Sequence, residues 1–216
     1  GGKPSALNAG MAVATGDFFV MTDVRQTVDP QALNRIMERF SDPAVGVVSG
    51  ALIIRDFETG LPSKASAYWR YEIRMRDHLS AIGSIFGATG ALYAIRRELA
   101  VPIPREILLD DMYLPLAAFF RGYRLGLEPA ARIYDYPVNL RSEFDRKVRT
   151  LAGNYQILAA YPQLIDPRRN PLWWHFMSYK FARLLLPFAL IGVLIGSLGL
   201  PLPLRQAAFA PQVLIY

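Results

Sequence analysis

The stretch FFVMTDVRQTVDPQALNRIMERF, residues 18–40, combines a predicted strand, a charged turn and a predicted helix. Its apolar start, 18–21, is typical of a strand buried on both faces in a parallel sheet. Asp29 and Pro30 predict a helix start, as N-cap and first helical residue. The i, i+3, i+4, i+7 spacing that marks one buried helix face is shown by Leu33, Ile36, Met37 and Phe40. A second apolar run, 44–54, predicts the next strand, and this order indicates an α/β sheet.

The same alternation continues to residue 140. Helices are predicted at 6–14, at 63–82 and directly after Asp110–Asp111, and strands at the end of 87–97 and near 125–127. In open α/β sheets, ligands bind beyond the carboxyl ends of the strands. Asp23 lies at such an end, so it is the first candidate for a functional side chain.

The composition excludes several classes of protein. With 52% hydrophobic and 19% charged residues among 216, the chain is long and apolar enough for a sizeable core and is not disordered. It has no cysteine and two histidines, which excludes disulfides, thiolate chemistry and a histidine-rich metal cluster. The net charge of +6 suits nucleic acid, a membrane surface or phosphate-bearing substrates. We expect no nucleic-acid partner, because no nucleic-acid-binding motif is present.

The character of the chain changes after residue 140. Residues 141–180 are predicted to form a basic amphipathic region at a membrane interface. A transmembrane helix is predicted from Phe181 to Leu200, since about 20 helical residues span the ~30 Å hydrocarbon core, and the start of a second span follows within 181–216. A buried core helix is the alternative, and three glycines without a polar face disfavour it. Basic residues before the span predict that the preceding domain is cytoplasmic.

The first and last residues do not resemble natural termini. The chain begins without Met or a signal-peptide pattern and ends within an apolar run. We therefore interpret it as a segment of a longer protein.

Two acidic sites are candidates for chemistry. Asp23 is either a turn residue or a ligand that holds Mg²⁺ or Mn²⁺ against a diphosphate, because phosphate oxygens and waters can complete the metal shell. Arg25 could contact a phosphate directly. Asp110 and Asp111 either cap the following helix or form a repelling pair, in which the pKa of one carboxyl rises towards that of a general base.

Two further segments are less specific. The small residues GATGA, 87–91, would let the backbone approach a ligand or another element closely. The basic run RKVRT, 146–150, with Asn154 could neutralise phosphates or face lipid headgroups.

Five motifs in this order resemble one known family: GGKPSALNAGMAVATGDFFVMTD (1–23), GATGALYAIRR (87–97), LLDDMYLPLAAFFRGYRLGLEPAA (108–131), EFDRKVRTLAGNYQIL (143–158) and HFMSYKFARLLLPF (175–188). They look like the bacterial membrane glycosyltransferases of family 2, relatives of cellulose and hyaluronan synthases. The resemblance implies a GT-A-like fold, a mixed sheet flanked by helices and followed by interfacial and transmembrane helices. Residues 1–140 would be the C-terminal part of that catalytic domain, with the first half of its sheet upstream.

The resemblance also implies an activity. The chain would transfer a sugar, with inversion, from a nucleotide-diphosphate donor to a polysaccharide or lipid-linked acceptor. It would do so with Mg²⁺ or Mn²⁺ at the cytoplasmic face of the inner membrane, in contact with membrane lipid.

The family motifs match particular residues of this chain. Donor binding falls to Lys3, Asn8, Asp23, Arg146 and Arg149, with Asp23 as the metal ligand. Asp111 matches the catalytic base, and acceptor contacts fall to Gly90, Ala91 and the adjacent Asp110.

Two departures from the family pattern leave alternatives open. Arg25 replaces the second acid of the DxD motif, which puts metal ligation in question. Thr150 replaces the tryptophan of the QxxRW motif, so stacking of the acceptor there is not assumed. These departures favour, as an alternative, a non-catalytic membrane-anchored relative that binds nucleotide or glycan. A basic membrane-surface protein that recruits partners is a third interpretation, and it leaves the Asp110–Asp111 pair unexplained.

Overall fold

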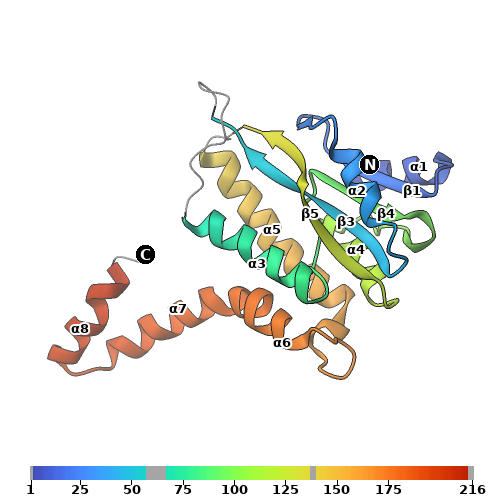
Figure 1. Ribbon diagram of the computed structural model, residues 1–216. Helices are drawn as coiled ribbons and strands as arrows, with labels where there is room; N and C mark the ends of the chain where they lie inside the picture. Colours follow the sequence, from blue (N-terminus) through green and yellow to red (C-terminus); the bar gives the residue numbers. More distant parts are fainter. Residues whose placement is uncertain (1, 57–66, 137–139, 214–216) are drawn as a thin grey trace. The chain divides into compact units, whose positions relative to one another are not determined.

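The computed structural model describes residues 2–56, 67–136 and 140–213 (Figure 1). The chain divides into two compact units, Gly1–Leu172 and Trp173–Tyr216. All the described strands belong to the first unit, and the described part of the second unit is helical.

A mixed sheet runs through the first unit in the order β1-β4-β3-β5-β2. Its strands are β1 (Phe18–Thr22), β2 (Thr27–Val28), β3 (Val45–Ile54), β4 (Leu92–Arg96) and β5 (Arg124–Asp135). β4 is antiparallel to β1 and β3, β3 and β5 are parallel, and β2 is antiparallel to β5. β1, β3 and β5 therefore point the same way, and their carboxyl ends lie at one end of the sheet.

β1 differs from the strand predicted at 18–21. Phe19 and Met21 are buried, whereas Val20 between them is 41% exposed. The prediction of a parallel strand buried on both faces is wrong, because β4 lies between β1 and β3. β1 is thus an outer strand of the described sheet with one face exposed.

Helix α2 (Ala32–Arg39) covers one face of the sheet. The prediction of Asp29 as N-cap and Pro30 as first helical residue is wrong, because Gln31 is the N-cap and the helix begins at Ala32. The Asp29 Oδ1 instead accepts a hydrogen bond from the backbone N–H of Gln31, at 3.0 Å, in the turn before the helix. Ile36 and Phe40 are buried as predicted, but Leu33 is 46% exposed and lies outside the packed face. Burial of each such large side chain contributes about 1.5–3 kcal/mol, so this face is a main source of core stability.

The other face of the sheet carries helices α3 (Ala67–Ile82) and α4 (Asp110–Phe119). Val48 belongs to the α2 cluster, whereas the next residue, Ser49, contacts Arg76 of α3, so α2 and α3 lie on opposite faces (Figure 1). Residues 63–66 of the predicted helix 63–82 lie outside the described residues. The remaining helices of this unit are α1 (Lys3–Val13), η1 (Arg97–Leu99), α5 (Leu140–Ala160) and η2 (Pro162–Ile165).

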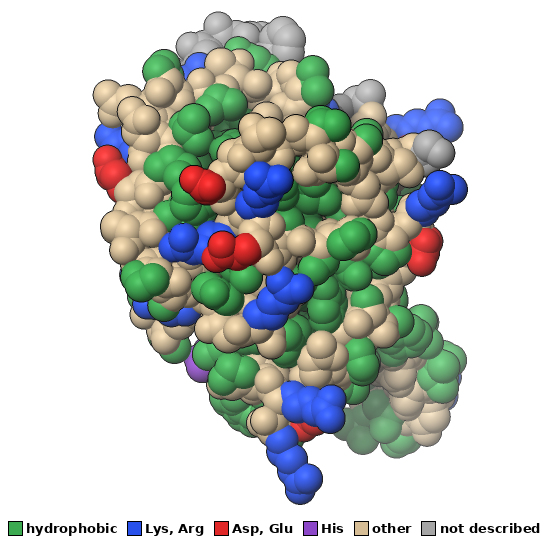
Figure 2. All heavy atoms as spheres, turned by 90° about the vertical axis from the view of Figure 1, so that its right-hand side faces the viewer, with side chains coloured by type: hydrophobic (Ala, Val, Ile, Leu, Met, Phe, Trp, Pro, Cys, Tyr) green, Lys and Arg blue, Asp and Glu red, His purple; other side chains and the backbone are tan. Residues whose placement is uncertain are grey.

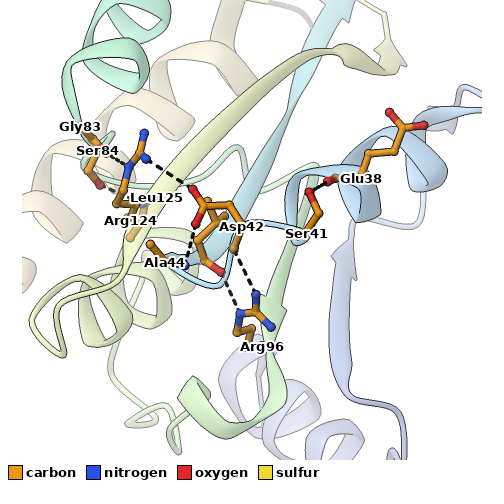
Figure 3. A network of polar contacts seen from close by, with 10 residues as sticks. Glu38, Ser41, Asp42, Ala44, Gly83, Ser84, Arg96, Arg124 and Leu125 are labelled. Carbon is orange, nitrogen blue, oxygen red and sulfur yellow. Dashed lines mark hydrogen bonds and ion pairs between the residues drawn. The ribbon is translucent and has the colours of Figure 1, made fainter.

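Arginines secure the amino-terminal end of β3 (Figure 3). Arg96 donates to the carbonyl oxygens of Val45, at 2.8 Å, and of Phe40, at 3.0 Å. Arg124 lies 3.5 Å from the carboxylate of Asp42 and donates to the carbonyl oxygen of Gly83. These arginines are engaged in structural contacts, at the end of β3 opposite the carboxyl ends of the strands.

The second unit comprises α6 (Trp173–His175), the π-helical segment η3 (Phe176–Phe181), α7 (Ala182–Leu198) and α8 (Leu202–Val213). The first three form one continuous helix of 26 residues, which contains an 18-residue window with a mean hydropathy of 2.1 and is long and apolar enough to cross a membrane. That helix begins eight residues before the predicted Phe181. The segment PLPLRQ, residues 201–206, is mostly helical, because α8 begins at Leu202.

Surface charge is dispersed on the face seen in Figure 2. Lys and Arg side chains there are interspersed with acidic and apolar side chains. On this face, the basic side chains that contribute to the net charge of +6 are scattered and do not form one basic patch.

Candidate functional site

Two aspartates, Asp23 and Asp110, meet at the ammonium group of Lys3. Lys3 begins α1, Asp23 follows β1 and Asp110 begins α4. The Lys3 Nζ lies 3.4 Å from the Asp23 Oδ1 and 3.1 Å from the Asp110 Oδ1. Burial would lower the pKa of Lys3, but the carboxylates of Asp110, Asp23 and, more weakly, Asp111 outweigh it and hold that pKa above its usual value. The site therefore stabilises positive charge.

The acidic pair lies within the helix it was predicted to precede. α4 begins at Asp110 itself and Leu109 occupies the N-cap position, so neither aspartate is the N-cap. Both carboxylates stand in the first helical turn, where the helix dipole favours negative charge. Asp110 is 4% exposed, and Lys3 compensates its charge.

The small-residue loop packs directly against Asp111. The backbone N–H of Ala88 donates to the Asp111 carbonyl oxygen at 2.8 Å. A Cβ at Gly90 would lie 2.9 Å from the Asp111 Oδ2, and Gly87 has a φ of +151°. The backbone N–H of Asp23 donates to the carbonyl oxygen of Ala91 at 3.3 Å. This loop therefore brings Asp23 and Asp111 to one place.

An arginine that the sequence did not single out anchors the loop. Arg76 donates to the Thr89 Oγ1 at 3.0 Å, and to the Gly87 carbonyl oxygen and the Ser49 Oγ at 3.3 Å each. Ser49 Oγ also accepts a hydrogen bond from the backbone N–H of Thr89 at 2.8 Å. α3, β3 and the loop beside Asp111 are thus joined by one polar network.

Tyr93 lies beneath the acidic residues. Its side chain is fully buried on β4, and its hydroxyl has no hydrogen-bond partner among the described residues. Burial, and then the negative charges of Asp110, Asp111 and Asp23, raise the pKa of Tyr93 well above its usual value. Tyr93 therefore stays protonated in the folded protein.

A cavity of about 750 Å³ opens beside Asp111. It lies along the carboxyl-terminal half of β3, with walls from α3 and β5. Its charged lining residues are Arg55, Glu72, Arg76, Asp111 and Arg132. The volume is within the usual range for a small-molecule site.

Two predicted donor ligands have other partners in the structure. Arg25 donates to the Asp135 Oδ2 at 2.6 Å. The side-chain amide of Asn8 donates to the Ile103 carbonyl oxygen at 2.8 Å and accepts from the Ile103 N–H at 2.9 Å. Asn8 thus fixes α1 to the segment that leads to α4, which positions Lys3.

Arg146 and Arg149 lie on the exposed amino-terminal half of α5. Arg146 pairs with Glu143 of its own helix. Among the contacts of the described residues, neither arginine reaches Asp23, Asp110 or Asp111. The carboxyl-terminal half of α5 is linked to the segment before α4, because Gln156 hydrogen-bonds to the backbones of Glu106 and Leu108.

The described residues contain no group of three or more side chains of the metal-binding types His, Cys, Asp and Glu. Asp23 is a single, partly exposed carboxylate, and Lys3 is its cationic partner. Oxygen ligands of this kind suit Mg²⁺ or Mn²⁺ when a diphosphate supplies the remaining oxygens. The residues present therefore fit a metal that is bound together with its substrate.

Comparison with known proteins links the first part of the chain to one family. Residues 1–101 match the family model for Glycosyl transferase family 2. The first 101 residues of the chain are therefore similar to glycosyltransferase family 2 domains. This confirms the resemblance inferred from the five motifs.

Individual relatives of the chain are distant. Poly-beta-1,6-N-acetyl-D-glucosamine synthase from Staphylococcus aureus strain COL is 24% identical over 179 residues, 80% of this chain and 43% of the relative, and the protein from strain N315 matches equally. The chain thus spans less than half the length of these curated relatives. The solved mannosyltransferase PcManGT from Pyrobaculum calidifontis, in complex with GDP-Man and Mn²⁺, has a TM-score of 0.73 at 22% identity, covering 100% of this chain and 60% of its own. The fold is therefore GT-A-like, as predicted.

Sequence reasoning missed Ser49, Arg76 and Tyr93. Ser49 gave a usable signal, because it is a polar residue within the apolar run 44–54. Arg76 gave none, since α3 carries several other charged residues.

Proposed function

We propose that the chain belongs to an inverting glycosyltransferase that moves a sugar from a nucleotide-diphosphate donor to a glycan or lipid-linked acceptor. The observation that carries the proposal is the convergence of Asp23, Asp110 and Asp111 around Lys3 and the loop at Gly90. Asp111, the proposed base, lines a cavity of ligand size, and the loop 87–91 that packs against Asp111 also contacts the backbone of Asp23, the proposed donor ligand. The family match and the polysaccharide synthase among its relatives support the same activity.

Donor binding is assigned to Asp23 and Lys3. Asp23 would hold Mg²⁺ or Mn²⁺, and the bound metal would neutralise charge on the leaving diphosphate. Lys3 supplies a second positive charge at the same position, which favours a phosphate oxygen there. Arg146, Arg149, Arg25 and Asn8 remain predicted donor contacts.

Asp111 is assigned as the general base. An acceptor hydroxyl in the cavity would attack the anomeric carbon from the face opposite the leaving diphosphate. The carbon–oxygen bond to the diphosphate breaks, and the hydroxyl proton passes to the Asp111 carboxylate. One displacement of this kind inverts the configuration at that carbon. Gly90, Ala91 and Asp110 would line the acceptor side.

We propose a membrane location for the full-length enzyme. The helix Trp173–Leu198 has the length and hydropathy of a span. Arg168 and Arg169 precede it, and Lys180 and Arg183 lie in its first part. This bias of positive charge favours a cytoplasmic catalytic part at the inner membrane.

A non-catalytic relative is the second candidate. It is favoured by Arg25, which replaces a second acid and pairs with Asp135. The test is hydrolysis of a panel of nucleotide sugars by the full-length protein, with and without Mn²⁺. We expect hydrolysis that depends on Mn²⁺ and is lost in Asp23→Asn. Saturable donor binding without any turnover would instead support the non-catalytic protein.

A further inference from the structure

The cavity beside Asp111 has a largely apolar wall. Ile53 of β3, Ile73 of α3, and Leu127 and Pro129 of β5 line it. Such a wall favours a ligand with an apolar part, because burial contributes about 25 cal/mol for each Å² of apolar surface.

Two arginines at this cavity have guanidinium groups without an anionic partner in the described part of the chain. The Arg55 guanidinium lies 3.5 Å from the centre of the Tyr134 ring. Arg132 is exposed, and its backbone carbonyl oxygen accepts a hydrogen bond from the backbone N–H of Asp29. A third arginine, Arg76, is held by the loop network. Planar guanidinium groups bind phosphate in a bidentate manner, so the lining suits an anion.

A neutral glycan finds few uncharged partners on the same lining. Among the described lining residues, Thr89 and Tyr134 are the uncharged side chains with a hydrogen-bonding group. Thr89 Oγ1 accepts from Arg76, and the Tyr134 hydroxyl donates to the Asp29 Oδ2 at 3.3 Å. Arg55 covers the ring of Tyr134, the aromatic side chain of the lining, and so occupies a surface on which a sugar could stack.

We propose that the cavity binds the acceptor, and that this acceptor carries a phosphate between its reacting sugar and an apolar chain. The proposal rests on the proposed function, because it uses Asp111 as the base. The phosphate would contact Arg55 and Arg132, and the apolar chain would follow the wall of Ile53, Ile73 and Leu127. The sugar hydroxyl would face Asp111, lose its proton to that carboxylate and form the new bond to the anomeric carbon as the diphosphate leaves.

The test measures binding by calorimetry on the full-length protein in detergent, without a donor. The probes are geranyl phosphate, geraniol, inorganic phosphate and a neutral N-acetylglucosamine tetrasaccharide. We expect geranyl phosphate to bind at least about tenfold more tightly than each of the other three, since it alone combines a charge with an apolar chain.

Variants locate the binding site. Arg132→Gln should weaken the binding of geranyl phosphate about tenfold or more, because a charge-assisted hydrogen bond is lost. Arg55→Gln is the second variant, in case the first perturbs β5. The matched control is Arg74→Gln, an exposed arginine of α3 that does not line the cavity. It should leave the affinity unchanged.

Three results would overturn the proposal: equal binding of geraniol, preferential binding of the tetrasaccharide, or equal weakening by Arg74→Gln. Because no donor is present, the outcome is independent of turnover. Binding of geranyl phosphate by a protein that never hydrolyses a donor would refute the transferase and leave the ligand class standing.

Discussion

At the scale of single residues, the site depends on how closely charged groups approach. Lys3 contacts Asp23 and Asp110, and the carboxylate of Asp111 lies against Gly90. Asp23 follows β1, whereas Asp110 and Asp111 both belong to α4, so a small displacement of either element alters the whole group. Two substitutions test this arrangement without removing a charge.

Gly90→Ala should lower kcat about 100-fold, since the new Cβ would lie 2.9 Å from the Asp111 Oδ2 and displace it, and misplacement by about 1 Å costs this much. Donor affinity should change little. Gly10→Ala is the control, because a Cβ at Gly10 of α1 meets nothing within 4 Å. Steady-state kinetics and donor titration provide the comparison. Unchanged kcat in Gly90→Ala would contradict the assigned position of Asp111.

Tyr93→Phe should stabilise the fold by about 1 kcal/mol at pH 7, since it removes a buried hydroxyl without a partner in the described structure. The raised pKa means that the folded protein keeps the phenolic proton while the unfolded chain releases it above pH 10. The wild type therefore loses stability relative to the variant as the pH rises past 10. Denaturant unfolding at pH 7 and above pH 10 measures both effects. A gap that narrows with rising pH would contradict the assignment.

At the scale of elements, side-chain hydrogen bonds hold the helices and loops around the acids. Asn8 joins α1 to the segment before α4, and Arg76 joins α3 to the loop at Thr89. These contacts, more than the strands themselves, determine where Lys3 and Asp111 lie.

Asn8→Ala should destabilise the protein by about 2 kcal/mol, because the N–H and carbonyl groups of Ile103 lose their partners. Asn34→Ala, an exposed asparagine of α2, should change the free energy of unfolding by less than about 0.5 kcal/mol. Chemical unfolding compares the two variants. If Asn8→Ala loses donor affinity while its free energy of unfolding is unchanged, the structural role is contradicted and Asn8 is a direct donor ligand.

The existence of most elements could be predicted, because their apolar periodicity is local. The position of β4 could not, since its insertion between β1 and β3 depends on pairing between distant segments. The acids were predictable because they interrupt or end apolar runs. The contact of Asn8 with Ile103, 95 residues away, has no local signal.

At the scale of the whole molecule, a GT-A-like unit precedes a helix long and apolar enough to cross a membrane. The similarity to glycosyltransferase family 2 was predictable because five motifs occur in order. The cavity behind the proposed acceptor class was not predictable, because it is built from segments far apart in sequence.

The central claim is that Asp23 and Asp111 serve one reaction, the first in binding the donor and the second as the base. The most direct measurement is sugar transfer and donor binding by full-length Asp111→Asn, side by side with the wild type. We predict that transfer falls by at least about 100-fold, as for loss of a general base, while Mn²⁺-dependent donor binding is retained. Transfer at the wild-type rate by Asp111→Asn would contradict the account.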